Sequence, residues 1–181
     1  MRRQDFEHVL AAAAEVAGHD ELVVIGSQAI LGSHSEPPAT LLVSLEVDVY
    51  PLEDPDAAIK IDGALGDGSQ FHRTFGYYAH GVGPETARAP GGWKERLIRS
   101  EIPQRVASKR TPTAWCLEIH DLVLSKCVAG RDRDWEYANE VLKAHLVDPD
   151  VLFDRIPDLP VPAQARRHIE NMLRSMVAGI D

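Results

Sequence analysis

Two apolar runs near the start of the chain predict the strands around which the rest is organised. Leu22 to Ile25 is uninterrupted, which is typical of a buried strand, and it ends at Gly26 and Ser27. The next four residues, Gln-Ala-Ile-Leu, predict a helix that begins directly at this turn. A loop at 32–40, rich in Gly, Ser and Pro, then leads to the second run.

The second run, residues 41–51, alternates polar and apolar side chains as a strand does. One face carries Ser44, Glu46 and Asp48, and the other carries Val43, Leu45, Val47 and Val49. The apolar neighbours favour a buried central strand whose polar face lines a cleft, although acids also alternate on the solvent face of edge strands. Because two carboxylates held side by side repel each other, the strand predicts a divalent cation such as Mg²⁺ at Glu46 and Asp48.

The turn at Gly26 and Ser27 adds a second chemical signal. A strand that runs into the first turn of a helix exposes backbone N–H groups and, here, one hydroxyl, which suits a phosphate group. The other interpretation is an ordinary turn in which Ser27 caps the helix and Gln28 faces solvent or bridges to the loop.

Helical spacing of apolar residues recurs along the rest of the chain. It predicts helices over 4–17, 55–65, 118–129, 132–146, 148–155 and 162–178, with Gly18, Gly66 and Gly130 as stops and Asp54 and Asp132 as caps. Strands are predicted over 71–82, 85–89, 93–102 and 106–116. Together these elements predict an α+β fold, a mixed β-sheet flanked by helices with a helical C-terminal third. We expect an α/β core over 1–117 and a helical subdomain over 118–181, packed as a single compact unit.

Composition narrows the class of protein further. The chain has 181 residues, 44% hydrophobic and 26% charged, as an ordinary globular domain has. No run approaches the length of a membrane span, and acids interrupt the N-terminal residues where a signal peptide would be apolar. We therefore expect a cytoplasmic protein in which Cys116 and Cys127 are reduced, buried thiols.

The charge distribution bears on nucleic-acid binding. The net charge of −9 argues against binding nucleic acid over the whole surface. A basic run lies in the second half of the chain, at Lys94, Arg96, Arg99, Arg105, Lys109 and Arg110. Solvated sides of edge strands are the favoured interpretation, and contact with a polyanion such as RNA is the other.

The Gly-Ser turn followed by an acid-x-acid strand resembles the nucleotidyltransferase superfamily of the polymerase β type. The closer resemblance is to the uncharacterised bacterial nucleotidyltransferase-like family DUF6036, which is related to AbiEii-type toxins. The matching segments are Gly26 to Ile30, Glu46 to Pro51, Phe71 to Val82, His120 to Lys126 and Ala129 to Asp134. They cover most of the chain from about residue 20 to residue 145.

The resemblance implies a nucleotidyltransferase-like fold and transfer of a nucleoside monophosphate from an NTP. It implies that Glu46 and Asp48 bind Mg²⁺, with Mn²⁺ as the other candidate, and that Gly26, Ser27 and Gln28 bind the nucleotide. Lys126 matches the motif lysine of AbiEii-like proteins, which contacts the triphosphate, and Asp134 matches the aspartate that follows it. The other interpretations are that Lys126 is a solvated side chain and that Asp134 stabilises the first turn of its helix.

The resemblance leaves the acceptor open. AbiEii-like relatives include toxins that modify tRNA and are held off by an antitoxin protein, whereas other superfamily members modify small antibiotics or proteins. The basic run favours tRNA or another RNA.

Two departures from the superfamily pattern motivate a rival hypothesis. The first acid is Glu46 rather than the commoner Asp, and no third acid on a neighbouring strand is identifiable from the sequence. His80 and Tyr78 are expected to pack in the core or at the rim of the cleft. The rival is a catalytically degenerate fold that binds NTP or another protein.

Overall fold

The computed structural model describes residues 1–104 and 110–180 and divides into two compact units. The sheet unit comprises Met1–Thr86 and Leu97–Leu117, and the helical unit comprises Ala87–Arg96 and Glu118–Asp181. The segment Ala87–Arg96 belongs to the helical unit because it forms hydrogen bonds with residues of that unit. Gly91 donates its N–H to the Asp158 carbonyl at 3.0 Å, and the Arg96 guanidinium donates to the Asp121 carboxylate at 2.8 Å.

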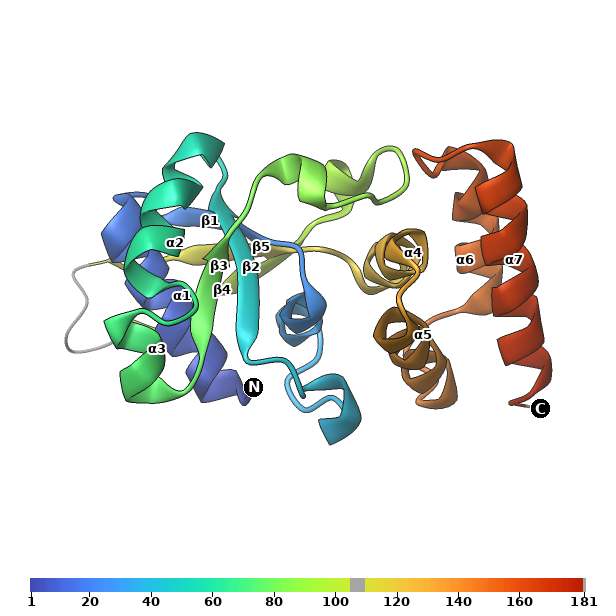
Figure 1. Cartoon of the computed structure of the whole chain (residues 1–181), viewed down its shortest axis with the longest axis horizontal. Coiled ribbons are helices and arrows are strands. Elements are labelled where there is room, and N and C mark those ends of the chain that lie inside the picture. Colours follow the sequence, from blue (N-terminus) through green and yellow to red (C-terminus); the bar gives the residue numbers. More distant parts are fainter. Residues whose placement is uncertain (105–109, 181) are drawn as a thin grey trace. The chain divides into compact units, whose positions relative to one another are not determined.

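In the part of the chain that the structure describes, five short strands form one mixed sheet in the order β3-β2-β1-β5-β4 (Figure 1). They are β1 (Glu21–Val24), β2 (Glu46–Pro51), β3 (Tyr78–Gly81), β4 (Ile98–Glu101) and β5 (Thr113–Cys116). β1 runs antiparallel to β2 and parallel to β5, β2 runs parallel to β3, and β4 runs antiparallel to β5. The predicted α+β class with a mixed sheet is confirmed, and β2 is an interior strand with a neighbour on each side.

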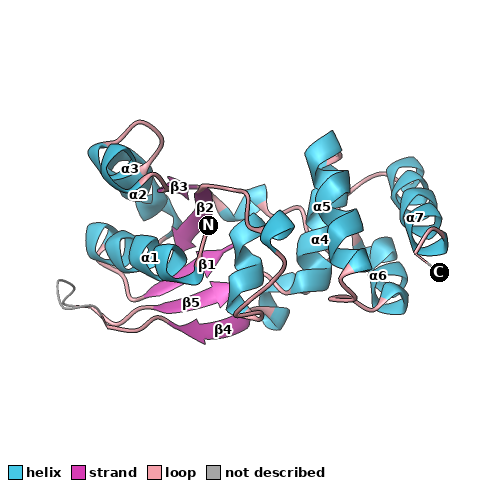
Figure 2. Ribbon diagram, turned by 90° about the horizontal axis from the view of Figure 1, so that it is seen from below, coloured by secondary structure: helices cyan, strands magenta, loops and turns pink. Residues whose placement is uncertain are grey.

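Three helices cover one face of this sheet: α1 (Arg3–Ala17), α2 (Ala58–Leu65) and α3 (Gln70–Phe75) (Figures 1 and 2). The buried side of α1 repeats at helical spacing through Phe6, Val9, Leu10, Ala13, Ala14 and Ala17. Gly18 ends the helix in the left-handed conformation, with φ 79°, as the sequence predicted.

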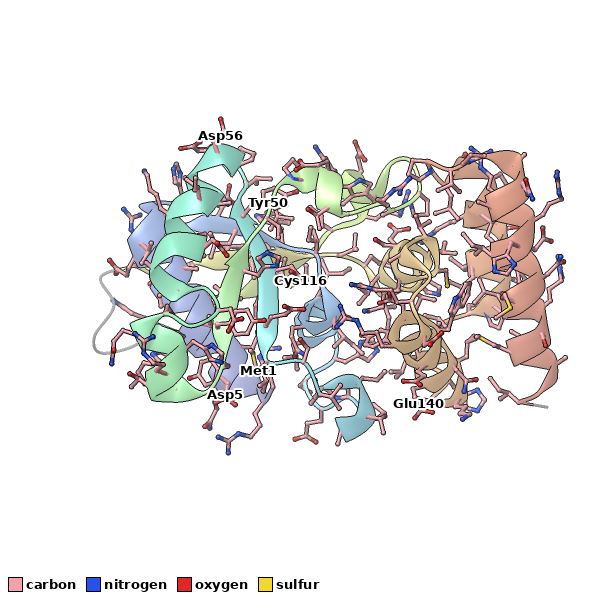
Figure 3. All side chains as sticks on the ribbon, viewed as in Figure 1. Met1, Asp5, Tyr50, Asp56, Cys116 and Glu140 are labelled. Carbon is pink, nitrogen blue, oxygen red and sulfur yellow. The ribbon has the colours of Figure 1, made fainter. Side chains whose placement is uncertain are left out.

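Within the described residues, 3₁₀ helices connect the main elements: η1 (Ser27–Gly32), η2 (Ala39–Leu41), η3 (Pro55–Ala57), η4 (Pro84–Thr86), η5 (Trp93–Arg96) and η6 (Ile156–Asp158). Gly32 of η1 lies against Cys116 so closely that a Cβ there would be 2.4 Å from the Cys116 Cβ. Cys116 lies inside the sheet unit (Figure 3), and both cysteines are free and buried. Burial raises the pKa of each thiol to about 12. The prediction of buried thiols is confirmed, and the two cysteines form no disulfide.

The prediction that residues 41–51 form one long buried strand is wrong in its first half. Only Glu46–Pro51 is a strand, and Val43 and Leu45 are 78% and 54% exposed. β1 pairs with β2 only from Pro51 back to Val49, and β3 pairs with β2 only from Val49 back to Glu46. Before Glu46, the Leu45 carbonyl still accepts the Tyr78 N–H at 3.0 Å, but the ladder between β2 and β3 begins at Glu46. The side chains of Val43 and Leu45 therefore lie beyond the sheet face.

Several of the predicted strands are helical over part of their length. Residues 70–75 form α3, because Ser69 caps it by accepting the His72 N–H at 3.0 Å and Gly76 ends it at φ 79°. Glu85 lies in η4, and residues 93–96 form η5 before β4 begins at Ile98. The predicted strand over 106–116 is seen as β5 at its end, while residues 105–109 lie outside the described part.

The helical unit contains α4 (Ile119–Ala129), α5 (Asp132–Lys143), α6 (Pro149–Arg155) and α7 (Ala163–Ala178), which confirms the helical C-terminal third. The assignment of Asp132 as the cap of α5 is wrong. The N-cap is Arg131, whose N–H donates to the Asp134 carboxylate at 3.3 Å. No helix in the described part of the chain has both the length and the apolar composition that crossing a membrane requires.

A cluster of charged side chains holds the helical unit together at the start of α4. Asp121, fully buried, accepts hydrogen bonds from the guanidinium groups of Arg96 and Arg155. Glu118 caps α4 and accepts from Arg155 and from His120. Burial alone would raise the pKa of Glu118, but the hydrogen bonds from His120 and Arg155 outweigh it and lower the pKa to about 2.

Glu118 should therefore make the helical unit sensitive to acid. Because its pKa is lower in the folded state than in the unfolded chain, its stabilisation is present above about pH 4.5 and is lost as pH falls toward 2. Glu118→Gln should lower the free energy of unfolding at pH 7 by about 2 kcal/mol and flatten the loss of stability over that range. Urea unfolding at a series of pH values measures both effects. An unchanged pH profile would contradict the role of this carboxylate.

Candidate active site

The two acids of β2 lie beside the turn that follows β1. The Ile25 N–H donates to the Asp48 carbonyl at 3.1 Å, which brings the end of β1 against the middle of β2. The Asp48 carboxylate lies directly over Gly26, since a Cβ built on Gly26 would be 1.9 Å from Asp48 Oδ2. Only a residue without a side chain fits at Gly26 while Asp48 stays where it is.

The neighbouring strand β3 adds two polar side chains next to the acids. The parallel register places Tyr78 opposite Glu46 and His80 opposite Asp48. The Tyr78 hydroxyl donates to Glu46 Oε2 at 2.9 Å, and His80 Nδ1 lies 2.9 Å from Asp48 Oδ1. Burial and the hydrogen bond to Glu46 raise the pKa of Tyr78 to about 12, so this hydroxyl stays protonated as a donor.

These side chains have the composition and spacing of a divalent-cation site. One ligand atom from each of Glu46, Asp48 and His80 lies within 4.8 Å of the other two. The cluster is open to water, because the side chains of Asp48 and His80 are 20% and 49% exposed. Carboxylate oxygens and imidazole nitrogen are metal ligands, and the close fit of Gly26 under Asp48 keeps one carboxylate in place. The residues present therefore fit a divalent cation.

The residues after Gly26 form the first turn of η1 rather than an α-helix. Gly26 has extended backbone angles, φ −83° and ψ −168°, and its carbonyl accepts the Ala29 N–H at 2.9 Å. The Gln28 side chain is fully buried, and its amide donates to the Ser44 carbonyl at 3.4 Å. Gln28 therefore supports the segment that leads into β2, and its side chain is turned into the core.

A family model described as nucleotidyltransferase of unknown function (DUF6036) matches residues 4–175 of the chain. The chain belongs to this family. Its match covers both units, so the DUF6036 nucleotidyltransferase pattern includes the sheet with its acids and most of the helical unit. Membership implies a nucleotide substrate, and nucleotidyltransferases typically depend on a metal ion. No curated protein and no solved structure matches the chain.

The helical unit of this DUF6036 chain contains two further candidate residues, Lys126 and Asp134. Their side chains contact each other. Lys126 Nζ is 3.2 Å from Asp134 Oδ1 and 4.6 Å from the centre of the Tyr137 ring. Asp134 is fully buried and also accepts from Arg131 at 2.6 Å. Burial alone would raise the pKa of Asp134, but the hydrogen bond from Arg131 and the charge of Lys126 outweigh it and lower the pKa.

Removing the charge of Lys126 should destabilise the helical unit. Lys126→Met keeps the apolar stem but leaves the buried Asp134 carboxylate with Arg131 as its charged partner, so we expect a loss of about 1–3 kcal/mol in the free energy of unfolding. Lys143→Met is the matched control, since the Lys143 side chain is 54% exposed and its partner is Glu140. It should cost less than about 0.5 kcal/mol. Equal effects in urea unfolding would contradict the assignment.

The basic run predicted from the sequence is largely neutralised within each unit. In the sheet unit Arg99 pairs with Glu101 at 2.8 Å and Arg110 pairs with Asp20 at 2.8 Å. In the helical unit Arg96 pairs with Asp121 at 2.8 Å. Arg105 and Lys109 lie outside the described residues. These pairs favour the interpretation of the run as ordinary surface and structural charge.

Sequence reasoning missed the part that Tyr78 and His80 play. Both were assigned to core or rim packing, whereas their polar atoms contact Glu46 and Asp48. The signal was present as a spacing, because Tyr78 and His80 are two residues apart, as Glu46 and Asp48 are, and therefore point to one face of a strand. What the sequence does not show is that β3 pairs with β2 in parallel and in this register.

Proposed function

We propose that this DUF6036 protein transfers a nucleoside monophosphate from an NTP to an acceptor group, with a divalent cation bound by Glu46 and Asp48. The observation that carries the proposal is the Asp48 carboxylate lying over Gly26, because it brings the acid pair and the Gly-Ser turn into one site. Family membership supports the reaction class, and the exposure of Asp48 and His80 supports access from solvent.

In this proposal each of the site residues in the sheet unit has a defined role. Glu46 and Asp48 hold the cation, and the Tyr78 hydroxyl orients the Glu46 carboxylate through its 2.9 Å hydrogen bond. Gly26 and Ser27 bind phosphate oxygens of the NTP through the N–H groups of the first helical turn. When bound, the cation neutralises charge on the triphosphate and lowers the pKa of the attacking hydroxyl.

The bond changes follow from the reaction class. The acceptor oxygen forms a bond to the α-phosphorus, the bond from the α-phosphorus to the α–β bridging oxygen breaks, and pyrophosphate leaves as the acceptor proton is released. The protein's contribution is positioning and charge neutralisation rather than a covalent intermediate.

Transfer is tested with the four NTPs, each labelled with ³²P at the α-phosphate, incubated with the protein, Mg²⁺ or Mn²⁺, and a cell extract. The expected result is label in a macromolecule or small acceptor that depends on both protein and cation. If NTPs labelled with ³²P at the γ-phosphate label the acceptor instead, the reaction is that of a kinase. No transfer from any NTP with either metal would contradict the proposal.

The finer proposal, drawn from the resemblance to AbiEii-type toxins, is that the acceptor is RNA, in particular tRNA. A labelled product that RNase digests and protease does not would support an RNA acceptor. A labelled product that protease digests would show that the acceptor is a protein instead. A toxin role is tested by expressing the protein with and without the product of its neighbouring gene. Growth arrest that the neighbour relieves would support a toxin and its antitoxin.

One observation favours a second candidate, a fold that binds NTP without transferring it. The resemblance to polymerase-type enzymes implies a third acid on a neighbouring strand, and on β3 the residue opposite Asp48 is His80 rather than a carboxylate. Calorimetric titration with each Mg²⁺-NTP separates the two candidates when it is combined with the transfer assay. Tight binding without turnover supports the binding module, and no binding of any NTP contradicts both.

A further inference from the structure

His80 lies beside the acid pair of Glu46 and Asp48, and an imidazole at this position affects which metal ion the site prefers. We propose that the His80 imidazole binds the cation together with Glu46 and Asp48, so that the site prefers a first-row transition ion such as Mn²⁺ over Mg²⁺. The inference rests on the proposed function, because it identifies the metal of that same site. Nothing in the family description specifies this ligand or this preference.

The geometry supports His80 as a ligand of the same ion. Strands β2 and β3 run parallel, and their register sets His80 opposite Asp48. His80 Nδ1 lies 2.9 Å from Asp48 Oδ1, and one ligand atom from each of His80, Asp48 and Glu46 lies within 4.8 Å of the other two. Two adjacent ligands of an octahedral ion, each at about 2.1 Å from the metal, are about 3 Å apart. The nitrogen and the oxygen therefore already have the separation of two ligands of one ion.

Other histidines of the sheet unit show what distinguishes His80. His19 Nε2 is 3.5 Å from Asp54 Oδ2, and His72 Nδ1 is 3.0 Å from Asp67 Oδ1. Each of these is a histidine beside one aspartate. His80 has two carboxylates within reach, on a neighbouring strand whose backbone is fixed by ladder hydrogen bonds. Three ligands held on two paired strands are preorganised, whereas an isolated pair is not.

The chemistry of the donors gives the preference. Mg²⁺ takes oxygen ligands in a strict octahedron and gives up its water reluctantly, so an imidazole in its shell is unfavourable. Transition ions accept imidazole nitrogen as well as carboxylate oxygen. A site of two carboxylates and one imidazole should therefore discriminate between Mn²⁺ and Mg²⁺, and the discrimination should depend on His80.

The test measures metal binding directly and does not depend on an acceptor. Mn²⁺ is titrated into the full chain while the free-ion signal is followed by electron paramagnetic resonance, and Mg²⁺ is titrated by competition against bound Mn²⁺. In the wild type, pulsed measurements should detect coupling of bound Mn²⁺ to a ¹⁴N nucleus. His80→Ala should lose this coupling and bind Mn²⁺ at least about tenfold more weakly, with Mg²⁺ affinity changed less than about threefold. His80→Asp should shift the preference toward Mg²⁺.

His19→Ala is the matched control, because it removes a histidine paired with an aspartate elsewhere in the sheet unit. It should keep both affinities and the nitrogen coupling. If His80→Ala retains the coupling and the Mn²⁺ affinity, or loses affinity for both ions equally, the inference is overturned while the proposed function stands. If Asp48→Asn leaves Mn²⁺ binding unchanged, the cation site of the proposed function fails as well.

Discussion

Asp48→Asn is expected to reduce nucleotidyl transfer by at least about a thousandfold while the protein stays folded. The amide keeps the volume of the side chain and its place over Gly26, but it removes the negative charge that binds the cation. Without that charge the triphosphate is not neutralised, and the attacking hydroxyl is not activated. The measurement is transfer from α-³²P-NTP, with circular dichroism and thermal unfolding as checks on the fold.

Asp62→Asn is the control for this experiment. Asp62 is an exposed acid on α2 of the same unit, so its replacement changes the net charge equally without touching the site. Transfer should persist in the control. Undiminished transfer by Asp48→Asn would end the proposal that the β2 acids bind the catalytic cation.

Gly26→Ala should inactivate the site without removing any of its polar groups. The added Cβ would be 1.9 Å from Asp48 Oδ2 and 2.8 Å from its Cγ, so the carboxylate must move away. The backbone itself tolerates alanine, since φ at Gly26 is −83°. We expect Mn²⁺ affinity and transfer to fall about a hundredfold, because displacing a catalytic group by an ångström costs that much.

Gly63→Ala is the matched control. Gly63 is exposed in the middle of α2, and a Cβ there would meet nothing within 4 Å. This variant should keep full transfer and gain about 0.5–1 kcal/mol in the free energy of unfolding, since alanine favours a helix. Full transfer by Gly26→Ala would show that Asp48 need not lie over the turn, and the geometry of the site would have to be abandoned.

Elements with sustained helical spacing and clear ends could be predicted from the sequence. α1 and α4 end at Gly18 and Gly130, both in the left-handed conformation, as expected for a glycine after a helix. Short apolar runs could not be assigned, because their structure depends on a partner. Val43 and Leu45 alternate as a strand would, yet they are exposed because they precede the point at which β2 begins to pair with β3, at Glu46.

The segment 70–75 shows a different cause of error. Its aromatic residues suggested a strand, but Phe71 and Phe75 are four apart and contact His8 of α1 as neighbours on one helix face. Ser69 and Gly76 are residue types typical of a helix N-cap and a helix C-terminus, and they have these roles in α3. The local signals were present, and aromatic composition was given too much weight against them.

The candidate site was predictable as far as it is local in sequence. Glu46 and Asp48 are two residues apart on one strand, so their common face follows from the period of a strand. The contacts of Asp48 with Gly26 and with His80 depend on which strands pair and in which register. Pairing is decided by the whole sheet, so those contacts required the structure.

The position of the bound metal and nucleotide decides whether Glu46, Asp48 and the Gly26-Ser27 turn form one catalytic site. Crystals grown with Mn²⁺ and an α,β-methylene NTP, which cannot transfer its nucleotidyl group, give the ion's place from manganese anomalous scattering. We expect a peak bonded to Glu46 and Asp48, with the triphosphate against Gly26 and Ser27. A nucleotide and metal bound at another place on the chain, or no ion at Glu46 and Asp48 under saturating Mn²⁺, would contradict the proposal.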